Sequence, residues 1–324
     1  MTQNPLWNAH LALRLRSATV LLLLVSTGCS VKKLAINRLA DSLASQGTSS
    51  FAIDDDPELV GEALPFALKL MEGLLDQVPQ NRGLLFATSS GFTQYSYVWV
   101  QQPADEMEQQ DVERAREMHV RARKLYLRAR DYGLRGLEVK HPGFAEALHR
   151  DATSAVRVTR KSDVPLLYWT AASWGAAISV SKDVPDLVAD QPIVEALIDR
   201  SLLLDPDFEH GAIHGFLISY ESARQGAKGD CAVRSRQHFD EQVRLTQGNL
   251  ASPFVSLAET VSVSQQNKKE FESLLNSALA IDPNAKPEWR LNNIVMQRRA
   301  RWLLSREDDL FLSDTAEEQH DASR

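Results

Sequence analysis

The sequence predicts an all-α protein whose helices pair into hairpins and stack into a curved array. Apolar residues recur at intervals of three and four through most of the 324 residues, which is the period of an amphipathic helix. Proline and glycine separate these periodic stretches. No stretch shows the apolar–polar alternation that is typical of a strand. The length is sufficient for a sizeable core in one or two domains.

The least polar stretch is 166–181, which contains Trp169 and Trp174 and no charged side chain. It is shorter than the roughly 20 residues that span a bilayer. It therefore predicts a helix buried inside the protein. A second helix is expected over 192–204, where Asp205-Pro206 ends it because proline cannot continue a helix. We place the centre of the fold here.

Further helices are expected on both sides of this centre, with an acidic loop over 103–111. Asp54-Asp55-Asp56-Pro57 is a strong helix start, since aspartate caps free N–H groups and proline fits the first turn. The expected helices are 32–45, 58–78, 84–101, 112–140, 144–155, 207–223, 230–246, 252–264, 268–281 and 287–304. We divide the chain into a signal segment (1–28), a lipidated N-terminus with a short helix (29–50), a helical domain (51–312) and a polar tail (313–324).

The N-terminus has the features of a bacterial lipoprotein signal. Two arginines precede a short apolar run, and small residues lead to Cys29. We expect cleavage after residue 28 and acylation of Cys29, palmitate included, which places the protein on the periplasmic side of the envelope. Ser30 favours the outer membrane. A plain signal peptide and an uncleaved anchor remain alternatives, since Ser26 stands where such signals usually carry leucine.

Composition and motifs argue against several functions. The net charge of −7 disfavours nucleic acid, which needs clustered positive charge. His210 and His214 stand four residues apart, on one expected helical face with Glu221, but Gly211 occupies the place of a zinc peptidase's glutamate. We predict no enzyme, no metal and no cofactor, and keep a hydrolase using His214 and Glu221 as an alternative. Cys231 is expected to be buried in a helix.

Four expected helices end ahead of a proline. The prolines are 63, 64 and 77 residues apart, and two of these gaps are close to two tetratricopeptide units of about 34 residues. Degenerate tetratricopeptide-like hairpins would bury a continuous core and leave a concave face free. A plain bundle with chance proline spacing is the alternative. The four pairs are Val78-Pro79, His141-Pro142, Asp205-Pro206 and Asp282-Pro283.

Two groups of side chains allow both a structural and a binding interpretation. Aromatic residues near the centre fit a core, or an apolar ligand wall with polar handles. Arginines along 112–140 fit a solvated face, or a docking surface for an acidic partner. The aromatic group is Tyr95, Tyr97, Tyr168, Trp169 and Trp174, and the arginines are Arg114, Arg116, Arg121, Arg123, Arg128, Arg130 and Arg135.

Several stretches in order resemble the TatT family, the tetratricopeptide-like lipoprotein subunits of tripartite ATP-independent periplasmic (TRAP) transporters. They are DDDPELVGEALPFALKLMEGLL, SSGFTQYSYVWVQQ, LYWTAASWGAAISVSKD, GAIHGFLISYE, SPFVSLAETVSV and RLNNIVMQRRARWLL. The resemblance implies a helical periplasmic protein with a cavity or pore. It also implies a partnership with the transporter's solute-binding subunit, and a homo-oligomer, for example a trimer.

The resemblance further implies that the protein binds a small ligand and passes it to or from that subunit. A hydrophobic molecule would fit this role. The ligand-lining residues it suggests are Gln94, Tyr95, Trp169, Trp174, Lys182 and His214. The alternative is a helical-repeat envelope lipoprotein that acts as a scaffold and binds proteins only.

Overall fold

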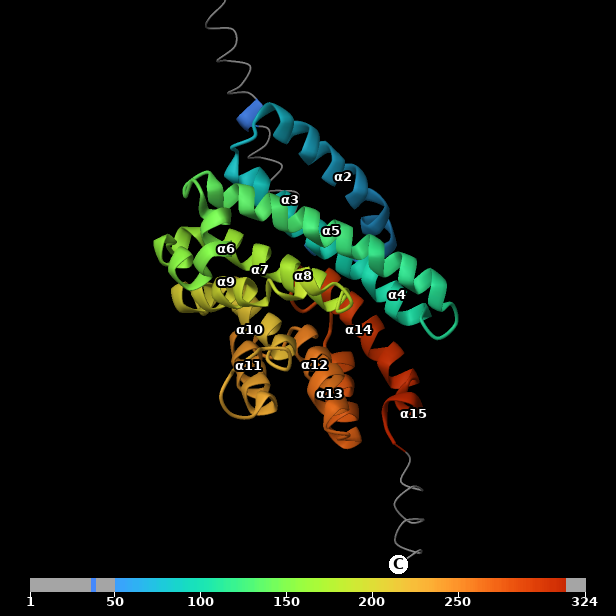
Figure 1. Cartoon of the computed structure of the whole chain (residues 1–324). Helices are drawn as coiled ribbons and strands as arrows, with labels where there is room; N and C mark the ends of the chain where they lie inside the picture. The colour runs from blue at the N-terminus through green and yellow to red at the C-terminus, as the bar shows by residue number, and fades with distance from the viewer. Residues whose placement is uncertain (1–35, 39–49, 313–324) are drawn as a thin grey trace, which may run out of the picture.

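The computed structural model describes residues 36–38 and 50–312 (Figure 1). Throughout these residues the regular elements are helices and no strand occurs, which confirms the predicted all-α class. Of the helix expected over 32–45, only 36–38 are described, and these are helical. Cys29, the signal segment and the polar tail lie outside the described residues.

Five helices lie side by side in chain order and form the first part of the fold (Figure 1). They are α2 (Pro57–Gln77), α3 (Arg82–Ser96), α5 (Val112–Glu138), α7 (Val164–Ser179) and α9 (Gln191–Leu204). The central helix is α7, as the uncharged stretch predicts, and it packs most extensively on α5. Gly133 allows this close approach, because a Cβ there would lie 2.2 Å from the Thr170 hydroxyl oxygen.

The second part of the fold lies below the first in Figure 1, and its last long helix contacts the first helix of the first part. Its first helix, α10, contacts both α7 and α9. Its last long helix, α14, reaches α2, where Arg298 pairs with Glu58. Nearby, Arg290 Nη1 donates to the Ile53 carbonyl at 2.9 Å. The long helices of this part are α10 (Phe208–Tyr220), α11 (Cys231–Thr246), α13 (Lys268–Ala280) and α14 (Arg290–Ser305), and the short helix α12 (Ser252–Leu257) lies between α11 and α13 in the chain.

Short elements connect these helices. The α-helical ones are α4 (Gln102–Met107), α6 (Phe144–Ala155), α8 (Pro185–Val188) and α15 (Glu307–Leu310). Single 3-10 turns are η2 (Val156–Val158), η3 (Lys161–Asp163) and η5 (Pro287–Trp289). Two segments, η1 (Tyr97–Gln101) and η4 (Ala258–Ser262), are π-helical. Such π turns are rare and occur frequently at functional sites.

Two sequence-based expectations about local structure are wrong. The loop predicted over 103–111 is helical as far as Met107, because the π turn η1 leads into α4 and Pro103 stands in the first turn of α4, where proline is tolerated. Cys231 is exposed instead of buried. It is the first residue of α11, directly after the capping Asp230, so it lies at the helix end instead of on the packed face.

Candidate functional site

The six residues suggested as ligand contacts come from α3, α7, the segment after α7, and α10, and their burial differs. Trp174 and His214 are buried, Tyr95 and Trp169 are half-buried, and Gln94 and Lys182 are exposed. The six side chains therefore differ in how accessible they are to a ligand.

Trp174 is enclosed by protein, with 1% of its surface exposed. Its indole Nε1 donates to Asp190 Oδ2 at 3.2 Å. The Arg130 guanidinium carbon lies 4.7 Å from the centre of a ring of the indole, and His149 meets it edge-on. A side chain with its donor satisfied and its faces covered supports the core, so the structure favours the core interpretation at this position.

His214 pairs with a histidine that the sequence did not single out. Its Nδ1 lies 2.9 Å from Nδ1 of His238, and one of these nitrogens must donate while the other accepts. At least one ring is therefore neutral. Burial lowers the pKa of His214, and burial together with the neighbouring His214 lowers the pKa of His238 to about 4. The pair is built to stay uncharged near neutral pH.

The expected helical face is formed only in part, because His210 lies in a left-handed turn before the regular helix. His214 and Glu221 both face His238, whose Nδ1 lies 2.9 Å from His214 Nδ1 and whose Nε2 lies 3.9 Å from Glu221 Oε1. The ring of His210 packs edge-on against Trp289, with ring centres 5.4 Å apart. Glu221 accepts from Arg234 Nε at 2.5 Å, so it serves an ion pair. Across the described part of the chain, no three or more His, Cys, Asp or Glu side chains are grouped so that they could hold a metal ion.

The chain reaches α10 through an unusual turn. Glu209, His210 and Gly211 have φ angles of 43°, 55° and 87°, so three successive residues adopt the left-handed conformation. Non-glycine residues in this region cost of order 1–3 kcal/mol each, and such strain clusters at functional sites. Burial raises the pKa of Glu209 to about 7. The Glu209 side chain nevertheless keeps an exposed surface, so solvent weakens this shift.

Trp169 lies close to this turn through a chain of rings. Its ring meets Tyr168 edge-on, with centres 5.1 Å apart, and Tyr168 packs on Phe208 at 5.5 Å. Burial and the charge of Glu209 both raise the pKa of Tyr168. The Trp169 indole N–H is buried and finds no acceptor among the described residues. A buried donor without an acceptor is uncommon in folded proteins, so this N–H is a candidate contact for a molecule that the described residues do not include.

A hollow of about 440 Å³ contains Lys182 and none of the other five suggested residues. Its walls are mainly apolar, and Lys182 provides its only formally charged group. The hollow is largely open to solvent, so it would cover only one side of a bound molecule. Its lining residues are Lys182, Pro185, Val188, Ala189, Pro192 and Gln225.

A polar cluster missed by the sequence analysis joins the two parts of the fold. Arg299 on α14 is 5% exposed and pairs with Glu259 on the π segment η4 and, at 3.4 Å, with Asp105 on α4. Its guanidinium carbon lies 4.1 Å from the centre of a ring of Trp302. Burial raises the pKa of Asp105, although His119 and Arg299 oppose this shift. The partners of Arg299 are too distant in sequence for any local pattern to reveal them.

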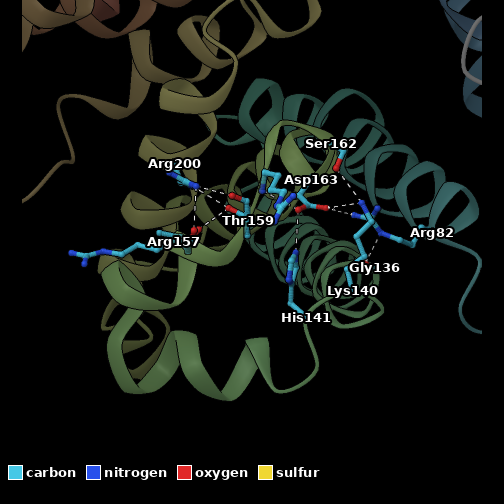
Figure 2. A network of polar contacts seen from close by, with 11 residues as sticks. Arg82, Gly136, Lys140, His141, Arg157, Thr159, Ser162, Asp163 and Arg200 are labelled. Carbon is cyan, nitrogen blue, oxygen red and sulfur yellow. Dashed lines mark hydrogen bonds and ion pairs between the residues drawn. The ribbon is translucent and has the colours of Figure 1, made fainter.

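The start of α7 is held by a second polar network (Figure 2). Buried Asp163 accepts from Arg82 Nη2 at 2.7 Å, from Lys140 Nζ at 3.3 Å and from the Arg160 backbone N–H at 3.0 Å, and its Oδ2 lies 3.1 Å from His141 Nε2. Burial alone would raise the pKa of Asp163. These hydrogen bonds and charges outweigh burial and lower the pKa to about 2. The network therefore fixes α7 against α3 and the end of α5.

Comparison with known proteins decides the family. The family model described as "TRAP transporter T-component" (TAtT) matches residues 53–311. The chain belongs to the TatT family. A Treponema pallidum (strain Nichols) protein with the name "Uncharacterized protein" is 30% identical over 313 residues, which cover 89% of this chain and 95% of that protein.

As a TatT protein, the chain is a component of TRAP transport, and this family is an accessory one that is not known for enzymes. TRAP components are associated with the cell envelope. Among the described helices, none combines the length and apolar character needed to cross a membrane.

Proposed function

We propose that this TatT protein is a lipid-anchored accessory subunit on the periplasmic side of the envelope. It associates with the TRAP solute-binding subunit and binds or passes on a small ligand. The single observation that carries this proposal is the family match over 53–311, which includes nearly all described residues. Acylated Cys29 would supply the anchor, and Ser30 favours the outer membrane.

We further propose that the helix pairs are degenerate tetratricopeptide-like units. The order of packing, α2 with α3, then α5, α7 and α9, supports a stacked array. Helices α2, α5, α9 and α13 each end shortly before one of the regularly placed prolines. A homo-oligomer, such as a trimer, is part of the same proposal, and light scattering of the purified protein would measure its mass.

The ligand proposal is best supported at Trp169 and Lys182. Trp169 has an unsatisfied indole N–H, and Lys182 lies in an apolar hollow. Gln94 and Tyr95 are accessible from solvent and remain candidates. A hydrophobic molecule with a carboxylate or carbonyl group would satisfy both kinds of feature.

The decisive experiment is co-purification with the solute-binding subunit from the same organism. The wild-type chain is expected to retain that subunit, and a detergent extract of the complex is expected to contain a small amphiphile. Trp169→Phe, which keeps an aromatic ring but removes the indole N–H together with the five-membered ring that carries it, is expected to weaken ligand binding while partner binding persists. A wild-type chain that retains no solute-binding subunit would contradict the proposal.

One observation favours the second candidate, an envelope scaffold that binds proteins only. Helix α2 exposes an apolar row on its outer side, with Leu59 at 56%, Phe66 at 75% and Leu70 at 43% exposure. Exposed apolar rows of this kind mark protein contacts. The transporter role and the scaffold role predict different neighbouring genes, and only the transporter role predicts a bound small ligand. TRAP membrane and solute-binding genes beside this one, and a co-purified amphiphile, favour the transporter role.

The lipid anchor needs its own measurement. Growth with a radiolabelled fatty acid is expected to label the wild type and to leave Cys29→Ser unlabelled. Cys231→Ser is the matched control, because it removes the other cysteine and should leave labelling unchanged. Labelling that persists in Cys29→Ser would rule out this anchor.

A further inference from the structure

Helix α5 carries four exposed arginines, Arg114, Arg121, Arg128 and Arg135, at intervals of seven residues. Seven residues advance a helix by about 10.5 Å and return to nearly the same side. These four side chains therefore form one line, roughly 30 Å long, on the surface of α5. We call this line the arginine row.

Neighbouring aromatic rings restrain the arginine row. The guanidinium carbon of Arg128 lies 5.0 Å from the centre of the Phe92 ring, and that of Arg135 lies 5.1 Å from the centre of Tyr132. The two rings stack on each other at 6.1 Å. An arginine already held against a ring loses less conformational freedom when it binds a partner. The row is thus partly organised for binding.

Arg121 is also restrained by an aromatic residue, Tyr95, and it has no carboxylate partner among the described residues. Its Nη2 donates to the Tyr95 hydroxyl at 3.3 Å, and Tyr95 stacks on Trp99 with ring centres 5.9 Å apart. Within residues 50–312, neither Arg121 nor Arg135 forms an ion pair with a carboxylate. No carboxylate of the described residues therefore neutralises the charge of either arginine at the surface.

The other two members of the row are paired within the chain. Arg114 pairs with Glu117 at 2.8 Å, and Arg128 pairs with Glu72. Exposed Lys124 adds a further positive charge next to the row. Within the described part of the chain, unpaired positive charge therefore remains at Arg121, Lys124 and Arg135, while a partner's carboxylates would compete with Glu117 and Glu72 at the other two arginines.

We propose that the arginine row docks an acidic helix of the TRAP solute-binding subunit. A helix laid along α5 with Asp or Glu every seventh residue places its carboxylates at the same spacing of about 10.5 Å as the arginines. Arginine suits such contacts because its fork binds a carboxylate through two hydrogen bonds. This inference rests on the proposed association with that subunit and identifies the surface that makes it.

The same helix supplies a matched control. Arg116 is also exposed, but lies two residues from Arg114, about 200° around the helix axis. A charge reversal at Arg116 changes the total charge of the protein as much as a reversal in the row does. It therefore separates the effect of position from that of net charge.

The test measures binding of the purified solute-binding subunit to the soluble chain as a function of salt. Arg121→Glu and Arg135→Glu are each expected to slow association about threefold at low salt, and the double variant about tenfold, because surface charges act mainly on the association rate. The differences should shrink at about 0.5 M salt, where charges are screened. Arg116→Glu should change the rate less than about twofold.

Unchanged thermal unfolding of the variants would show that the fold is intact. If the wild type binds and the row variants bind equally well, the arginine row is not the docking surface, while the proposed association stands. If the wild type does not bind the subunit, the association and this inference both fail. If the double variant loses only binding to vesicles that contain anionic phosphatidylglycerol, the row serves a membrane, and the inference is overturned.

Discussion

Replacing His238 by glutamine tests whether the buried histidine pair is uncharged in the folded protein. His238 has a pKa of about 4 in the fold against an ordinary value of 6.5, because burial and His214 disfavour its charged form. The unfolded chain therefore binds more protons than the folded one between these values. Stability that is present above pH 6.5 is lost as the pH falls toward 4.

The size of the effect follows from these two values. With a folded pKa of about 4 and an unfolded pKa of 6.5, linkage gives a loss of about 2 kcal/mol between about pH 7.5 and pH 5. Asp163, whose pKa is lowered to about 2, also stabilises the folded protein, but that stability is lost only at lower pH, when its carboxylate becomes protonated. Glu209 acts in the opposite direction, because a raised carboxyl pKa gives stability as the pH falls. Its effect is weakened by solvent, since the residue is exposed.

Urea unfolding followed by tryptophan fluorescence at several pH values would measure the effect. The difference in unfolding free energy between wild type and His238→Gln is expected to change by about 2 kcal/mol over this range. Subtraction removes Glu209 and the other shared groups that do not interact with His238, whereas His214 contributes to the difference because it loses its partner. His149→Gln, which removes an exposed ring, controls for the loss of an imidazole and should shift stability by less than about 0.5 kcal/mol. A wild-type-to-variant difference that is constant with pH would refute the neutral buried pair.

Three further outcomes can be checked by the same unfolding assay. Asp163→Asn should lower the unfolding free energy by about 2–3 kcal/mol at neutral pH, since the charges around it lose their carboxylate; a loss below about 0.5 kcal/mol would contradict this. Gly133→Ala should cost about 1–3 kcal/mol by forcing a methyl group against Thr170, whereas Gly73→Ala, with no heavy atom within 4 Å, should stabilise by up to about 1 kcal/mol. Equal effects of the two alanines would argue against the close α5–α7 contact. Trp174→Ala should cost about 3–5 kcal/mol, and weakened ligand binding without that cost would show that the ring contacts ligand instead of supporting the core.

The sequence predicts the helices well where local patterns determine them. The uncharged stretch 166–181 predicts the buried helix α7, and Asp56-Pro57 predicts the start of α2, where Asp56 accepts from the Leu59 backbone N–H at 3.0 Å. The acidic segment 103–111 is predicted wrongly for two reasons. The π turn η1, which leads into α4, has no recognised sequence signal. Asp105 on α4 pairs with Arg299, which is far away in the sequence.

The candidate site is harder to predict, since it depends on which residues meet. Helix α7 is apolar around its whole circumference, so its periodicity cannot tell that Trp174 is enclosed while Trp169 is half-exposed. His214 meets His238 through the packing of α10 on α11. Arg299 and Asp105 stand 194 residues apart, a distance over which a sequence pattern carries no information.

The contact between the last long helix and the first has a consequence for biosynthesis. Helix α2 emerges from the ribosome early and can pack on α3 at once, because domains form as the chain is made, N-terminal part first. Glu58 can form its ion pair only after Arg298, 240 residues further along the chain, has been synthesised. Until α14 arrives, the facing surfaces of both halves stay open to solvent and to chaperones. The contact between α14 and α2 can therefore form only after Arg298 has been made, and a chain truncated before α14 would lack it.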